Sequence, residues 1–115
     1  MYRTWSRLIN HNTIRIGLHT KDIHSINKID SIHTYKFYRE GSNLARCHTN
    51  EGIKYIVSNQ TGIITQINYD LLCHINKPDW YNHLNNSETW LCHIDTSNLT
   101  SRGYYNVDNE LFNYK

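Results

Sequence analysis

The sequence is poor in the residues that mark several protein classes: among its 115 residues are one Pro, five Gly, three Cys and a single alanine, Ala45. The low Gly and Pro content excludes collagen-like chains, and three cysteines are too few for a disulfide scaffold. No stretch approaches the ~20 apolar residues of a membrane-spanning helix, and no apolar run follows the basic N-terminal segment as in a secretory signal. We therefore expect a cytoplasmic chain without a signal peptide or a transmembrane segment.

The length predicts a single domain, because single domains cluster at about 100–150 residues. We expect its core to span approximately residues 14–80, with residues 81–115 as a C-terminal extension. Asn, Ile, Tyr and His are plentiful, and this composition lowers helix propensity and favours strands and turns. The formal net charge is only +2, so the composition allows binding to nucleic acid without requiring it.

The spacing of apolar residues predicts a helix followed by strands. Ile23, Ile26 and Ile29 recur every three residues behind Thr20, a good N-cap residue, and this predicts a helix within residues 20–32. Alternating stretches predict strands at residues 14–18, 33–39 and 45–48, with an edge strand at 88–94. Two β-branched runs at 53–58 and 63–67 flank a polar turn and predict a β-hairpin. A helix followed by an antiparallel meander indicates an α+β fold.

Each of the three cysteines precedes a histidine, in the pairs at residues 47–48, 73–74 and 92–93. No Cys-x-x-Cys or His-x(3–5)-His pair frames them with the spacing of a structural zinc site. Neighbouring residues on a strand point to opposite faces, so the two members of one pair do not converge on one ion. The sequence therefore predicts no metal and no cofactor, with each cysteine in the core and each histidine facing outward.

The predicted hairpin reads KYIVSNQTGIITQI at residues 54–67 and is followed by PDW at 78–80. These two segments resemble the closing hairpin of the tRNA-cleaving E-type colicin ribonucleases and related contact-dependent-inhibition toxin domains. The wider group is the barnase/EndoU/colicin/RelE-like ribonuclease superfamily. The resemblance implies an N-terminal helix or helices packed on a four- to five-stranded antiparallel sheet. It also implies a toxin that cleaves tRNA, reaches a target cell and has a cognate immunity protein or antitoxin. We expect a monomer that has no contact with a membrane.

Metal-free cleavage of RNA requires a base for the 2′-hydroxyl, an acid for the 5′-oxygen and a cation for the charged phosphorane. The candidate catalytic residues are Lys54, Arg46, His48 and His24. The candidate substrate-binding residues are Lys36, Arg39, Tyr55, Thr65 and Gln66. The resemblance carries over Lys54, Tyr55, Thr65 and Gln66. The other five are proposed from their side-chain chemistry. Most of them fall within one predicted sheet, so they would line one cleft.

Two other functions fit the sequence. One is a non-catalytic protein-binding module, such as an immunity protein, an antitoxin or a phage-encoded inhibitor, although partners of basic ribonucleases are usually acidic. The other is a metal site built from the Cys-His pairs. Cleavage of tRNA in EDTA tests the ribonuclease function. A stoichiometric complex with one protein tests the binding module, and metal analysis tests the metal site.

Overall fold

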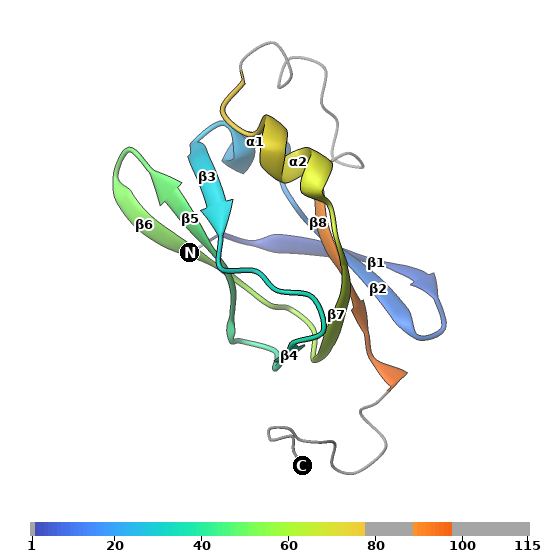
Figure 1. Cartoon of the computed structure of the whole chain (residues 1–115). Helices are drawn as coiled ribbons and strands as arrows, with labels where there is room; N and C mark the ends of the chain where they lie inside the picture. The colour runs from blue at the N-terminus through green and yellow to red at the C-terminus, as the bar shows by residue number, and fades with distance from the viewer. Residues whose placement is uncertain (1, 78–88, 98–115) are drawn as a thin grey trace.

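Two antiparallel β-sheets pack face to face in the part of the chain that the computed structural model describes, residues 2–77 and 89–97 (Figure 1). The larger sheet has five strands, in the order β1 (Thr4–Asn10), β2 (Thr13–Leu18), β8 (Trp90–Asp95), β7 (Gly62–Ile67) and β4 (Phe37–Tyr38). The smaller sheet has three strands, in the order β3 (Ile26–Asp30), β5 (Asn43–Thr49) and β6 (Gly52–Val57). The chain passes between the two sheets several times.

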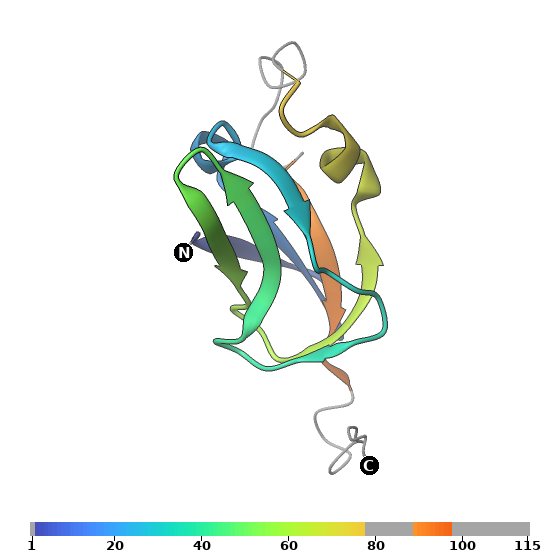
Figure 2. The same ribbon diagram turned by 60° about the vertical axis from the view of Figure 1, so that its left-hand side comes forward.

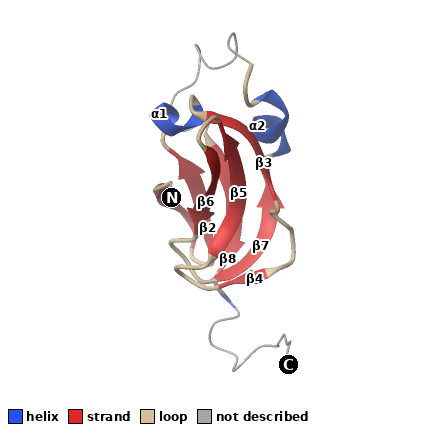
Figure 3. Cartoon of the chain, turned by 90° about the vertical axis from the view of Figure 1, so that its left-hand side faces the viewer, coloured by secondary structure: helices blue, strands red, loops and turns tan. Residues whose placement is uncertain are grey.

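The hydrophobic core lies between the sheets, where Figure 3 shows β3, β5 and β6 in front of β2, β8 and β7. Ile16 of β2 and Ile94 of β8 are fully buried on one side, and Leu44 of β5 and Ile56 of β6 are fully buried on the other. Side chains alternate across a strand, so one face of each sheet is apolar and the opposite face is left to solvent. The outward faces are therefore where polar side chains gather.

Two short helices lie at one end of the sandwich, α1 (Thr20–Ile23) and α2 (Tyr69–His74) (Figures 1 and 2). Ile23 of α1 and Leu71 of α2 are fully buried and fix the helices to the core. Asn68 caps α2: its side-chain oxygen accepts a hydrogen bond from Leu71 N, and its side-chain nitrogen donates to Trp90 O at 2.9 Å. The cap thus joins α2 to strand β8.

The α+β prediction, with an N-terminal helix packed on a sheet, is wrong, because strands dominate the described residues. The predicted helix at 20–32 ends at Ile23, and the chain continues as β3. Ile26 and Ile29 are both buried although they are three residues apart, because the register of β3 shifts at a bulge between Ile26 and Lys28. A bulge inserts one extra residue into a strand, and here the two residues between the isoleucines, Asn27 and Lys28, are both exposed. The apolar spacing of three therefore came from a bulged strand.

The predicted hairpin is also wrong in its pairing. Both of its strands form, as β6 and β7, but β6 pairs with β5 in the smaller sheet and β7 pairs with β4 and β8 in the larger one. The segment between them crosses from one sheet to the other. Ser58 marks this crossing, since its N–H donates to Ser42 O at 2.9 Å and its carbonyl accepts from Gly41 N at 2.8 Å.

The other strand predictions have mixed outcomes. The strands at 14–18 and 45–48 are confirmed within β2 and β5, whereas 33–39 contains only the two-residue strand β4. The predicted edge strand at 88–94 is β8, which lies inside the larger sheet between β2 and β7. The PDW motif at 78–80 and most of the predicted C-terminal extension, residues 81–88 and 98–115, lie outside the described residues.

Candidate functional site

The outward face of the three-stranded sheet carries a group of polar side chains that the strand register brings together. Cross-strand rows join Asp30, Arg46 and Tyr55 in one line and Lys28, His48 and Ile53 in the next. Their neighbours along the strands, such as Cys47 and Ile56, are fully buried, so the six side chains of these rows face solvent. We call these six residues the outer face of the small sheet.

Asp30 is the centre of this face. Its Oδ1 accepts a hydrogen bond from Arg46 Nε at 2.9 Å, and its Oδ2 accepts one from Arg46 Nη2 at 3.3 Å. His48 Nε2 lies 2.9 Å from the same Oδ2, and Lys28 Nζ lies 3.8 Å from it. One carboxylate thus holds a guanidinium and an imidazole in fixed positions beside each other.

The hydrogen bonds from Arg46, and next those from His48, hold the pKa of Asp30 well below its ordinary value. The carboxylate is therefore ionised at neutral pH and can only accept hydrogen bonds. Its contact with His48 Nε2 consequently requires a proton on that nitrogen. In the neutral imidazole, Nδ1 is then the nitrogen with a lone pair and the one that can accept a proton.

The outer face of the small sheet is open to ligands. The side chains of Arg46 and His48 are 43% and 35% exposed, while that of Asp30 is 25% exposed. Lys28 and Arg46 supply two positive charges against one carboxylate, so the group carries an excess positive charge that favours an anion. The arrangement offers a proton acceptor, a guanidinium and an ammonium group within one small area.

Three of the nine predicted site residues gather here: Arg46, His48 and Tyr55. The sequence prediction does not include Asp30 and Lys28, because it places both residues in a helix at 20–32 and not in the sheet. The signal that identifies the site is the pair Arg46 and His48, two residues apart and therefore on the same face of one strand.

Four predicted residues lie elsewhere. Lys54 is on the opposite face of the small sheet, where it forms an ion pair with Glu51 at 3.0 Å. His24 is at the C-terminal end of α1. Thr65 and Gln66 are exposed on β7 of the larger sheet, where Gln66 pairs with His93. The structure therefore does not bring these four side chains to the cluster around Asp30.

Lys36 and Arg39 flank strand β4 and share a hollow of about 310 Å³ with the beginning of β5. Its lining residues are Lys36, Phe37, Tyr38, Arg39, Ser42 and Asn43. Asn43 is exposed and is three residues before Arg46 on the same strand, a separation of about 10 Å at ~3.3 Å per residue. A cationic hollow thus lies next to the outer face of the small sheet along β5.

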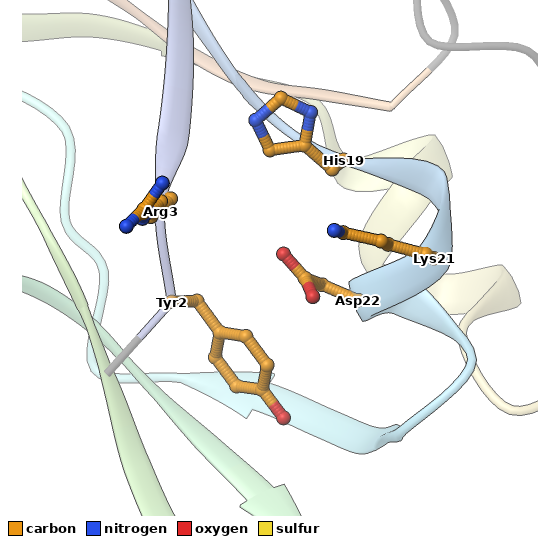
Figure 4. Close-up of a pocket in the computed structure, with 5 residues that line it drawn as sticks. All are labelled: Tyr2, Arg3, His19, Lys21 and Asp22. Atoms are coloured by element: carbon orange, nitrogen blue, oxygen red, sulfur yellow. The ribbon is translucent and has the colours of Figure 1, made fainter.

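A second hollow, of about 490 Å³, lies between the N-terminal segment and α1 (Figure 4). It is lined by Tyr2, Arg3, His19, Lys21 and Asp22, none of which was predicted to be functional. The hydroxyl groups of Tyr2 and Ser25 are hydrogen-bonded at 2.7 Å beside it. Neither hollow contains Asp30, Arg46 or His48, which lie on an open sheet surface.

The larger sheet has its own cluster on strands β2 and β8. Arg15 Nε donates a hydrogen bond to His93 Nε2 at 3.1 Å, and the guanidinium carbon of Arg15 lies 4.9 Å from the centre of the Trp90 ring. The His93 and Trp90 rings stack with their centroids 4.7 Å apart. Burial, and next the Arg15 charge, lower the pKa of His93. His93 is therefore held within the sheet by a hydrogen bond to its Nε2 and by stacking of its ring.

Comparison with known proteins gives information on the fold alone. No family model matches the sequence, and no curated protein matches it. Among solved structures, the chain is similar to a glycine cleavage system H protein from Mycobacterium marinum, with a TM-score of 0.63 and 10% sequence identity. The similarity covers 82% of this chain and 78% of that chain. At this identity the two proteins share a chain path, and no residue role passes from one to the other.

Neither of the two helices in the described residues has the length or hydropathy needed to cross a membrane.

Proposed function

We propose that the chain is a metal-independent endoribonuclease whose active site is the outer face of the small sheet. The observation that carries the proposal is the convergence of Arg46 and His48 on the ionised carboxylate of Asp30 at a solvent-accessible surface. Transfer of a phosphoryl group from RNA requires a proton acceptor beside a cation that can bind a phosphate, and this cluster offers both.

In the proposed reaction, neutral His48 accepts the proton of the 2′-hydroxyl on Nδ1 while Asp30 holds Nε2–H. The 2′-oxygen attacks phosphorus, and the bond between phosphorus and the 5′-oxygen breaks. Lys28 donates a proton to the departing 5′-oxygen. Afterwards His48 releases the proton it accepted to solvent, and Lys28 takes up a proton from solvent. The products are a 2′,3′-cyclic phosphate and a 5′-hydroxyl, and His48 and Lys28 return to their starting protonation states.

Arg46 stabilises the charged phosphorane in this scheme. Its Nε and one N–H of Nη2 are used by Asp30, and the remaining guanidinium N–H groups are available to phosphate oxygens. A fixed donor of this kind contributes typically ~10²–10³ in rate, because it needs no reorganisation when the charge develops. Asp30 therefore acts as a positioning residue for both Arg46 and His48.

The neighbouring surface suits an extended RNA strand. Tyr55 is 41% exposed beside Arg46 and offers a ring on which a base can stack. Lys36 and Arg39 line the hollow that also includes Asn43, which lies about 10 Å along β5 from Arg46, and they can bind the phosphate of a flanking nucleotide. The proposed site therefore contacts more than one nucleotide of a single strand.

We propose tRNA as the substrate, cut in the anticodon loop, because the sequence at 54–67 resembles tRNA-cleaving toxin domains. A toxin of this kind acts in the cytoplasm of a target cell and has a cognate inhibitor with an acidic surface that covers the basic site.

The test is incubation of the full chain with total tRNA in EDTA, followed by analysis of the fragment ends. We expect discrete fragments ending in 2′,3′-cyclic phosphate, and we expect His48→Ala to slow the cleavage by about 100-fold or more. The matched control is His11→Ala, an exposed histidine at the β1–β2 turn, which should cleave at the wild-type rate. Intact tRNA at a large excess of protein contradicts the proposal, as does undiminished cleavage by His48→Ala.

The second candidate function is a non-catalytic protein-binding module. It is favoured by Leu8 and Ile9 of β1, which are 64% and 42% exposed, since neighbouring exposed apolar side chains are typical of protein contacts. Under this alternative the tRNA stays intact, and the chain forms a stoichiometric complex with one protein.

A further inference from the structure

The three Cys-His pairs do not share one conformation. Cys47 of β5 and Cys92 of β8 are fully buried while the histidine that follows each of them faces outward, as expected for strands. Cys73 and His74 instead lie on helix α2, and Cys73 is exposed. On a helix, residues three and four apart share one side, so Cys73 and His74 can both lie beside Asp70.

Asp70, Cys73 and His74 occupy such a side of α2. Their ligand atoms all lie within 4.8 Å of one another, with Cys73 Sγ 3.3 Å from His74 Nδ1 and His74 Nδ1 3.4 Å from Asp70 Oδ1. With Zn–S near 2.3 Å and Zn–N near 2.0 Å, a tetrahedral ion separates sulfur from nitrogen by about 3.5 Å and nitrogen from oxygen by about 3.3 Å. The observed separations are close to both values.

The helix that carries these three residues is held firmly in place. Leu71 is fully buried and Ile75 is 6% exposed, so the core fixes one side of α2 and leaves the ligand side to solvent. The Asn68 cap fixes the first turn. A site on an anchored element needs little reorganisation on binding. His74 Nδ1 and Cys73 Sγ contact Asp70 O at 2.9 and 3.4 Å, and bonds to a metal would replace these contacts.

We propose that Asp70, Cys73 and His74 bind one divalent transition-metal ion of the zinc class, with water in the fourth position. A thiolate with an imidazole selects zinc, cobalt, nickel or copper over magnesium and calcium, which prefer oxygen ligands. Binding releases the thiol proton of Cys73 to solvent. This site lies on α2 and is independent of the proposed RNA cleavage, which needs no metal.

The experiment is a cobalt(II) titration of the metal-free, reduced full chain, followed by absorption. A thiolate ligand gives cobalt a charge-transfer band, and Cys73 is the thiol that can supply it, since burial raises the pKa of both Cys47 and Cys92 to about 12. We expect the band to saturate at one equivalent of cobalt, and zinc to remove it. A titration without the band, or one that zinc leaves unchanged, overturns the proposal.

Variants and a chemical readout test the ligand set. Cys73→Ser should abolish the band and His74→Ala should weaken binding at least tenfold, whereas His33→Ala, at an exposed histidine outside α2, should bind as the wild type does. A band that survives Cys73→Ser contradicts the assignment. In the unmutated chain, zinc should slow alkylation of Cys73, so the proposal does not depend on variants that fold. Alkylation at the same rate with and without zinc also contradicts it.

Discussion

At the scale of single residues, His93 shows how burial and a neighbouring charge set the protonation of a side chain. Its Nε2 accepts a hydrogen bond from Arg15 Nε at 3.1 Å, which requires an unprotonated Nε2 and therefore a neutral ring. The pKa of His93 is lowered from the ordinary 6.5, first by burial and then by the Arg15 charge. His93 thus stays neutral to lower pH in the folded chain than in the unfolded chain.

We predict that Arg15→Met raises the pKa of His93, because the variant removes a nearby positive charge and keeps most of the side-chain volume. NMR titration of the imidazole signals measures the pKa directly. The folded wild type binds fewer protons than the unfolded chain as the pH falls below about 6.5, so the free energy of unfolding decreases there. This decrease should be smaller in the variant. An unchanged pKa of His93 would show that Arg15 has no effect on it.

The candidate site was partly predictable at this scale. Arg46 and His48 could be identified because two basic residues separated by one position share the same side of a strand. Asp30 could not, because its place beside them depends on the pairing of β3 with β5. The motif at 54–67 predicts Lys54 as a site residue, whereas the register pairs Lys54 with Cys47 on the other face of the sheet.

At the scale of elements, strands β1 and β2 make a close contact that depends on a glycine. The Trp5 ring lies over Gly17, its cross-strand partner, and a Cβ added at Gly17 would overlap the ring. Trp5 Nε1 also donates to Leu18 O at 2.9 Å. Because Gly17 has no side chain, the Trp5 indole has room to lie on the sheet at this position.

We predict that Gly17→Ala lowers the free energy of unfolding by about 1–3 kcal/mol, the usual effect of inserting a methyl group into a packed contact. Urea unfolding measures the change. In a Trp5→Ala background the same substitution should cost much less, because the overlapping ring is gone. Equal costs in the two backgrounds would show that the glycine is needed for another reason.

The sequence predicts elements better than it predicts their partners. The strands within 13–18, 43–49, 52–57 and 62–67 could be recognised from β-branched and alternating residues. The β3 bulge buries Ile26 and Ile29, which are three residues apart as on a helix face. The local spacing therefore could not distinguish a helix from a bulged strand. The turn between β6 and β7 has the composition of a hairpin, but tertiary packing sends the two strands into different sheets.

At the scale of the whole molecule, the division of strands between two sheets decides which side chains share a surface. β3 and β5 are adjacent in the small sheet, so Asp30 meets Arg46 and His48 across sixteen and eighteen positions of sequence. β6 and β7 are adjacent in sequence but lie in different sheets, so Lys54 and Thr65 do not share a surface. The two-sheet architecture therefore separates residues that the predicted hairpin had joined.

We propose that RNA is cleaved at the outer face of the small sheet, with Arg46 as the donor to the phosphorane. The most direct test compares single-turnover cleavage of tRNA in EDTA by Arg46→Gln and Lys54→Gln, two variants that each replace a cation by the same neutral side chain. Removal of a donor to the phosphorane typically slows cleavage by ~10²–10³, so we predict a loss of that size for Arg46→Gln and a near wild-type rate for Lys54→Gln. The reverse order, with Lys54→Gln inactive and Arg46→Gln active, would contradict this assignment of the active site.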